Sequence, residues 1–108
     1  MTIRSRKLLD HARGCACQNC GRQDDTIVAA HANRQKLGKG MGEKAPDIFT
    51  AHLCHACHSW LDQGNGRDPT GIYAGNRSEK WDMFITAMHK TWAYLWSAGI
   101  IGLKDERR

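Results

Sequence analysis

The sequence predicts a small α+β domain, and three observations lead to this fold class. Two Cys-x-x-Cys pairs are separated by 33 residues, each lies beside a short segment with strand character, and a long amphipathic helix ends the pattern. A chain of 108 residues is long enough for one domain with a single core, so we treat residues 1–108 as one unit.

The composition is that of a globular protein that works inside the cell. Hydrophobic residues make up 41% and charged residues 25%, and 16 Lys and Arg against 11 Asp and Glu leave a net charge of +5. No run approaches the ~18 apolar residues of a membrane span, and the basic N-terminus lacks the apolar core of a secretory signal. We therefore expect a cytoplasmic protein with no membrane partner.

The cysteine spacing predicts a structural metal site. Reduced thiols that occur in clusters are more often metal ligands than disulfides, and two Cys-x-x-Cys turns together complete a tetrahedral Zn²⁺ shell. The fifth cysteine, Cys15, is either a free thiol or a replacement for the first ligand. A bound ion would also supply folding energy that a small core lacks. The predicted zinc ligands are Cys17, Cys20, Cys54 and Cys57.

The expected elements follow from local patterns along the chain. A basic helix is expected over 5–13, strands over 26–31 and 47–53 flank an irregular loop at 33–46, and a short helix follows the last cysteine as far as Gly64. The final helix is expected over about 78–98, with Ser78 as N-cap and Gly99 as terminator. Its apolar stripe, which we expect to pack in the core, comprises Trp81, Phe84, Ile85, Met88, Trp92, Leu95 and Trp96.

Two histidines bracket the loop and are the best candidates for chemistry. His31 ends the first strand, and His58 directly follows the last cysteine. Asp62 lies one helical turn after His58, so the two side chains share a helix face and could hold part of the shell of a divalent metal. His31 could then act as a general base. The loop adds a local charge of +3, suited to a phosphate backbone, through Arg34, Lys36, Lys39 and Lys44 against Glu43.

The order of these residues carries a resemblance to a known family. Ala30-His31, then Asp47, then Leu53-Cys54-x-x-Cys57-His58-x-x-x-Asp62 resembles the HNH nucleases of the ββα-metal fold. The resemblance is greatest to the small prophage-encoded nucleases of the YbcO type, and phage Ref-type recombination nucleases are more distantly similar. It covers about residues 6–66, with the core motif at about 15–66, and is weaker at the end of the last helix.

The resemblance implies a role for each matching residue. His31 would be the general base, and His58 and Asp62 would bind the catalytic Mg²⁺, Mn²⁺ or other divalent metal. Asp47 stands near a position where most of the family has asparagine, and it would hold the loop through hydrogen bonds to backbone. The implied activity is metal-dependent DNA endonuclease cleavage with low sequence specificity, with recombination proteins as further partners. Oligomeric state is left open.

Other interpretations of the same residues remain open. His31 could be a hydrogen-bonded strand-end histidine, His58 a neighbour of the zinc, and Asp62 a partner in a helix-end salt bridge. Many HNH enzymes have an acidic residue or histidine where this chain has Ala30, so phosphate oxygens and water would have to complete the metal shell. The alternative functions are a non-catalytic zinc module that binds nucleic acid, and a protein-interaction domain that docks through its Trp-rich helix.

Overall fold

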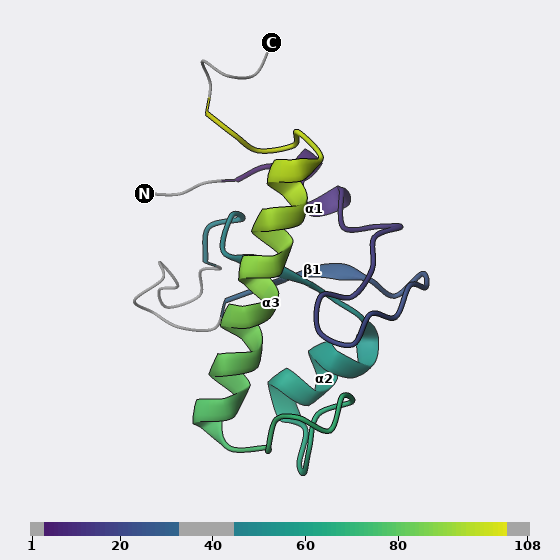
Figure 1. Cartoon of the computed structure of the whole chain (residues 1–108), viewed down its shortest axis with the longest axis vertical. Helices are drawn as coiled ribbons and strands as arrows, with labels where there is room; N and C mark the ends of the chain where they lie inside the picture. The colour runs from purple at the N-terminus through teal and green to yellow at the C-terminus, as the bar shows by residue number, and fades with distance from the viewer. Residues whose placement is uncertain (1–3, 33–44, 104–108) are drawn as a thin grey trace.

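The computed structural model describes residues 4–32 and 45–103. The elements are α1 (Arg6–Asp10), β1 (Val28–His31), β2 (Thr50–Leu53), α2 (His55–Gln63) and α3 (Arg77–Ser97). This is an α+β arrangement in which a two-stranded sheet lies between helices (Figure 1). The α+β class predicted from the sequence is confirmed.

The sheet is a short antiparallel pair that joins distant parts of the chain. Val28 pairs with Leu53 at one end and His31 with Thr50 at the other. Helix α2 starts two residues after β2 ends, because the Cys54 thiol caps it by accepting the N–H of Cys57. The sheet therefore presents His31 at the end opposite the start of α2.

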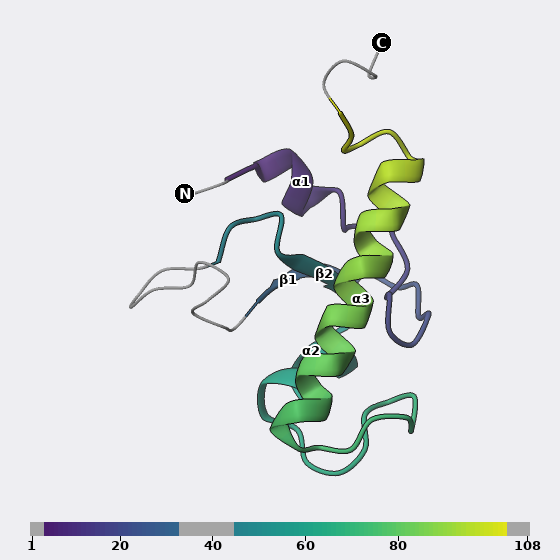
Figure 2. The same ribbon diagram turned by 60° about the vertical axis from the view of Figure 1, so that its left-hand side comes forward.

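Helix α3 is the longest element and packs along β2, as the two views show (Figures 1 and 2). A polar contact reinforces the apolar packing: the fully buried Thr91 hydroxyl accepts the N–H of His52 at 3.0 Å and donates to the carbonyl of Ala87 at 2.8 Å. The largest fully buried apolar side chains of the core are Ile27, Leu53, Met83, Phe84 and Leu95.

The tryptophans of α3 differ in their surroundings. Trp81 stacks on Phe84, and the indole N–H of Trp92 donates to the carbonyl of Ile48 at 2.8 Å. Both are packed against the core, as the apolar stripe predicts, whereas Trp96 is half exposed. The buried face also includes small and polar residues that the stripe does not contain, namely Ala87 and Thr91.

Several predicted boundaries are wrong, for local reasons. The first helix ends at Asp10 rather than 13, and the strands are shorter than 26–31 and 47–53. The second strand starts late because Asp47 belongs to a turn, in which the hydroxyl of Thr50 donates to its carbonyl. The N-cap of α3 is Asn76 and not Ser78, since the Asn76 side chain accepts the N–H of Glu79 at 2.9 Å.

The end of α3 agrees with the prediction. The helix stops at Ser97, and Gly99 follows with a φ of +75°, a conformation that glycine adopts without steric cost. Within the described part of the chain, no helix is both long and apolar enough to cross a membrane.

Candidate functional site

The four cysteines of the two Cys-x-x-Cys pairs form one cluster. The Sγ atoms of Cys17, Cys20, Cys54 and Cys57 all lie within 4.8 Å of one another, and those of Cys20 and Cys54 are 3.6 Å apart. A tetrahedral zinc with Zn–S bonds of about 2.3 Å would place its sulfurs about 3.8 Å apart. The cluster therefore has the dimensions of a four-thiolate metal site.

Backbone and side-chain donors surround these sulfurs. The N–H groups of Asn19 and Cys20 point at the sulfur of Cys17, at 3.4 and 3.5 Å. A hydrogen bond shared with Cys57 lowers the pKa of Cys17 and raises that of Cys57. Metal binding requires deprotonated thiols, and the N–H donors of Asn19 and Cys20 stabilise the anionic form of the Cys17 sulfur. The cluster could thus hold a metal ion, as the spacing predicts.

Cys15 does not join the cluster. Its thiol donates to the carbonyl of His11 at 3.1 Å and lies 3.6 Å from the hydroxyl of Tyr94. The alternative in which Cys15 replaces Cys17 as a ligand is therefore wrong, because Cys17 is the one that lies with the other three sulfurs.

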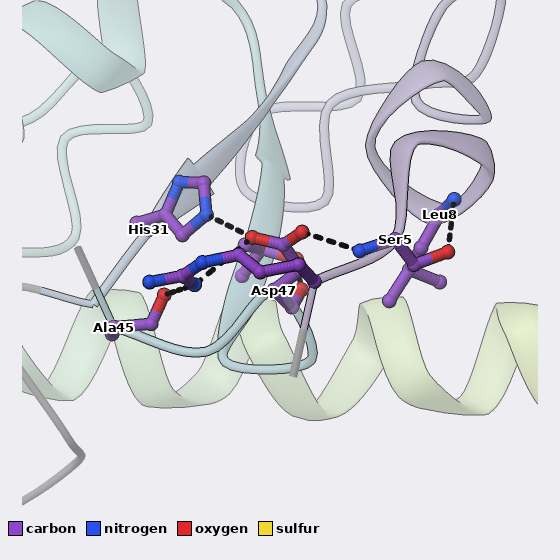
Figure 3. A network of polar contacts seen from close by, with 7 residues as sticks. Ser5, Leu8, His31, Ala45 and Asp47 are labelled. Atoms are coloured by element: carbon purple, nitrogen blue, oxygen red, sulfur yellow. Dashed lines mark hydrogen bonds and ion pairs between the residues drawn. The ribbon is translucent and has the colours of Figure 1, made fainter. Parts of the chain in front are cut away.

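A second polar site lies where β1 ends. The Nε2 atom of His31 is 2.8 Å from Oδ1 of Asp47, and the backbone N–H of Ser5 donates to Oδ2 at 2.6 Å (Figure 3). The guanidinium of Arg4 lies 3.4 Å from Oδ1 and donates to the carbonyl of Ala45 at 2.7 Å. One carboxylate thus joins the N-terminal segment, the turn before β2 and the end of β1.

This arrangement keeps Asp47 ionised. Burial alone raises the pKa of the carboxyl, whose side chain is only 5% exposed. The hydrogen bonds from His31 and Ser5 and the charges of His31 and Arg4 outweigh burial, so the pKa of Asp47 lies below its ordinary 3.8. An ionised carboxylate only accepts hydrogen bonds.

The ionised partner determines which nitrogen of His31 carries the proton. Since Asp47 can only accept, Nε2 must be the donor, and a neutral His31 then has a lone pair on Nδ1. That second ring nitrogen points away from the carboxylate, and none of the described residues forms a hydrogen bond with it (Figure 3). The His31 side chain is 17% exposed. It can therefore accept a proton from a small molecule such as water.

His58 and Asp62 form a separate pair on α2. Their Nε2 and Oδ2 atoms are 3.4 Å apart, one helical turn from each other, and both side chains are more than a third exposed. This confirms that the two share a helix face. Two such ligands suit a divalent cation whose remaining positions are taken by water or phosphate.

Among the described residues, the His31–Asp47 pair and the His58–Asp62 pair do not form one cluster of metal ligands. Among the described residues, the four cysteines are the only group of three or more His, Cys, Asp or Glu side chains that lie close enough to share one ion. His58 is not part of that group. The predicted phosphate contacts Arg34, Lys36, Lys39 and Lys44 lie outside the described residues.

Sequence patterns miss two features of these sites. The resemblance implies that Asp47 holds the loop through hydrogen bonds to backbone, whereas the backbone N–H that it accepts is that of Ser5 in the N-terminal segment. Its contact with the His31 ring has no signal in the spacing. Asn19 contacts the cysteine cluster from a position between two ligands, where side chains are usually treated as spacers.

Comparisons with family models, with curated proteins and with solved structures find no match to this chain.

Proposed function

We propose that this protein is a metal-dependent endonuclease that hydrolyses phosphodiester bonds in DNA, and that it resembles the HNH nucleases. The observation that carries the proposal is the His31–Asp47 contact, in which an ionised carboxylate holds a histidine so that its other ring nitrogen is available as a base. The net charge of +5 favours a polyanionic substrate.

His31 has the chemical role of proton acceptor. Its Nδ1 takes a proton from the attacking water, and the carboxylate of Asp47 stabilises the imidazolium that results. The Asp47 carboxylate does not have to reorient during the reaction, because the N–H of Ser5 already holds it in place.

Positive charge beside the base supports a phosphate substrate. Arg4 lies against Asp47, which also contacts His31, and 44% of the Arg4 side chain is exposed. Arginine is suited to phosphate oxygens because its N–H groups are arranged as a planar fork. Contacts of this kind position the backbone without reading sequence.

His58 and Asp62 would hold the divalent metal, Mg²⁺ or Mn²⁺. Such an ion supplies charge neutralisation for the phosphate oxygens when it is bound. The imidazole and the carboxylate lie on one face of α2, and both side chains are more than a third exposed. Zn²⁺ in the four-cysteine cluster would have only a structural role, because a closed four-thiolate shell has no position for water.

The experiment is conversion of supercoiled plasmid to nicked circles by the purified, zinc-loaded protein after addition of Mg²⁺ or Mn²⁺. We expect nicking that requires the added metal and is lost in His31→Ala and in His58→Ala. Retention of DNA at low salt without any nicking would contradict the proposal and favour the non-catalytic nucleic-acid-binding module. That alternative is favoured by the small number of protein ligands on α2.

A further inference from the structure

Asn19 lies between the two halves of the cysteine cluster. Its backbone N–H points at the sulfur of Cys17 at 3.4 Å, and its side-chain amide donates to the sulfur of Cys57 at 3.3 Å. Cys17 and Cys57 belong to different Cys-x-x-Cys pairs, so this one residue contacts both. The backbone contact with Cys17 is local, whereas the side-chain contact with Cys57 joins residues 38 positions apart and does not follow from the spacing.

The same amide also donates to a buried carboxylate. Nδ2 of Asn19 is 2.7 Å from Oδ2 of Asp68, a buried residue that is only 4% exposed. A carboxylate accepts and a sulfur ligand accepts, so the amide must turn its NH₂ group toward both. The two hydrogens of that group are thereby used, and the orientation of the Asn19 side chain is determined.

Asp68 is held in turn by its own loop. The N–H groups of Ile72 and Tyr73 donate to Oδ1 at 3.1 and 3.0 Å, and the N–H and hydroxyl of Thr70 contact Oδ2 at 3.2 and 2.8 Å. Burial raises the pKa of Asp68, but the hydrogen bonds from Asn19, Tyr73 and Thr70 outweigh it and lower the pKa below 3.8. The carboxylate is a fixed negative charge within a closed turn.

We propose that Asn19 is a positioning residue of the metal centre, which donates to sulfurs of both cysteine pairs and connects the centre to the 68–73 loop through Asp68. This rests on the proposed binding of zinc by the four cysteines. A zinc ion with four thiolates carries a net charge of −2, and each N–H donor offsets part of that charge and makes the sulfur less reactive. Asp68 polarises the amide and strengthens its donation to Cys57.

Two consequences follow from this connection. Loss of the amide should weaken metal binding about 10-fold or more, the range seen when partners of metal ligands are removed. The loop that contains Asp68 should also lose order when the ion leaves, because Asn19 is its side-chain contact with the cluster. Hydrogen exchange at the N–H groups of Ile72 and Tyr73 reports that order directly.

The test compares three variants by zinc content and by the rate at which a chromogenic chelator removes the ion. Asn19→Ala removes both side-chain donations, and Asn19→Asp keeps the shape but places a negative charge beside Cys57 and Asp68. Asn65→Ala is the matched control, since Asn65 is exposed and makes no side-chain hydrogen bond among the described residues. Co²⁺ replaces Zn²⁺ in a parallel set, so that the sulfur-to-metal absorption band reports charge at the thiolates.

We expect both Asn19 variants to bind one ion and to release it at least 10-fold faster than the wild type, with Asn19→Asp the faster. Their cobalt band should shift to longer wavelength, and Asn65→Ala should behave as the wild type. Release rates and cobalt spectra equal to wild type in both Asn19 variants would overturn the inference. A wild type that binds no zinc would instead overturn the underlying proposal of a zinc site.

Discussion

Replacement of Asp47 by asparagine changes one atom and tests how His31 is positioned. The carboxylate offers two accepting oxygens, one to His31 and one to Ser5. Asparagine offers one oxygen and one NH₂ group. If the NH₂ faced Ser5, two donors would meet at a separation of 2.6 Å in a buried site, so the amide should turn its oxygen to Ser5 and its NH₂ to His31.

This rotation reverses the tautomer of His31. Nε2 must then accept, the proton moves to Nδ1, and the nitrogen that should act as base is blocked. Loss of the correct tautomer costs up to about 10⁴-fold in catalytic rate in hydrolases that use a histidine–aspartate pair. Replacing two charge-assisted hydrogen bonds by neutral ones costs about 2 kcal/mol of stability, and the half-exposed Arg4 contact adds no more than ~1 kcal/mol.

Three measurements separate these effects. Nitrogen chemical shifts of the His31 ring report the tautomer, urea unfolding of the zinc-loaded protein gives the stability, and plasmid nicking gives the rate. We expect the proton on Nδ1, a loss of about 2–3 kcal/mol, and a 10²- to 10⁴-fold slower reaction. Asp82→Asn, at an exposed site on α3, removes the same charge and should change none of these quantities.

The opposite result has a clear meaning. Most HNH nucleases have asparagine near this position, so the resemblance alone predicts that Asp47→Asn is harmless. A variant that keeps the proton on Nε2 and nicks DNA at the wild-type rate would refute the role proposed for Asp47.

The remaining predictions concern the fold. Removal of the proposed zinc by a chelator should abolish the dispersed amide NMR spectrum, because a bound ion would supply folding energy that a small core lacks; a spectrum that stays dispersed would contradict a structural role. Thr91→Val should cost about 1–3 kcal/mol in urea unfolding, since the buried N–H of His52 loses its acceptor, whereas an unchanged midpoint would show that the bond is replaced. Asn76→Ala should cost about 1 kcal/mol by loss of the α3 cap, and Ser78→Ala, the cap suggested by the sequence, should cost less than half as much.

The sequence predicts those parts of the fold that depend on short-range patterns. The cysteine spacing correctly identifies four thiols that meet, because each pair is local and only the two pairs must be brought together. The end of α3 is also correct, since Gly99 terminates it by its own backbone preference. The predicted start of α3 is wrong because Asn76 and Ser78, two positions apart, can each cap a helix, and only the contact with Glu79 decides for Asn76.

The candidate site is harder to predict, because its contacts span the chain. Ser5 and Asp47 are 42 residues apart, and no periodicity relates them. His31 and Asp47 are separated by a loop, so their order in the sequence indicates a motif but not a hydrogen bond. The Asn19–Asp68 contact has the same character: both residues are common in turns, and only the folded chain brings them together.

In the proposed mechanism His31 takes the proton from the attacking water, and chemical rescue is the sharpest test of this role. The measurement is the metal-dependent nicking rate of His31→Ala with and without added imidazole, at a DNA concentration that saturates both proteins. If His31 is the base, the rate of His31→Ala should be at least 100-fold below wild type and should rise with imidazole concentration. A His31→Ala protein that nicks at the wild-type rate without imidazole would contradict it.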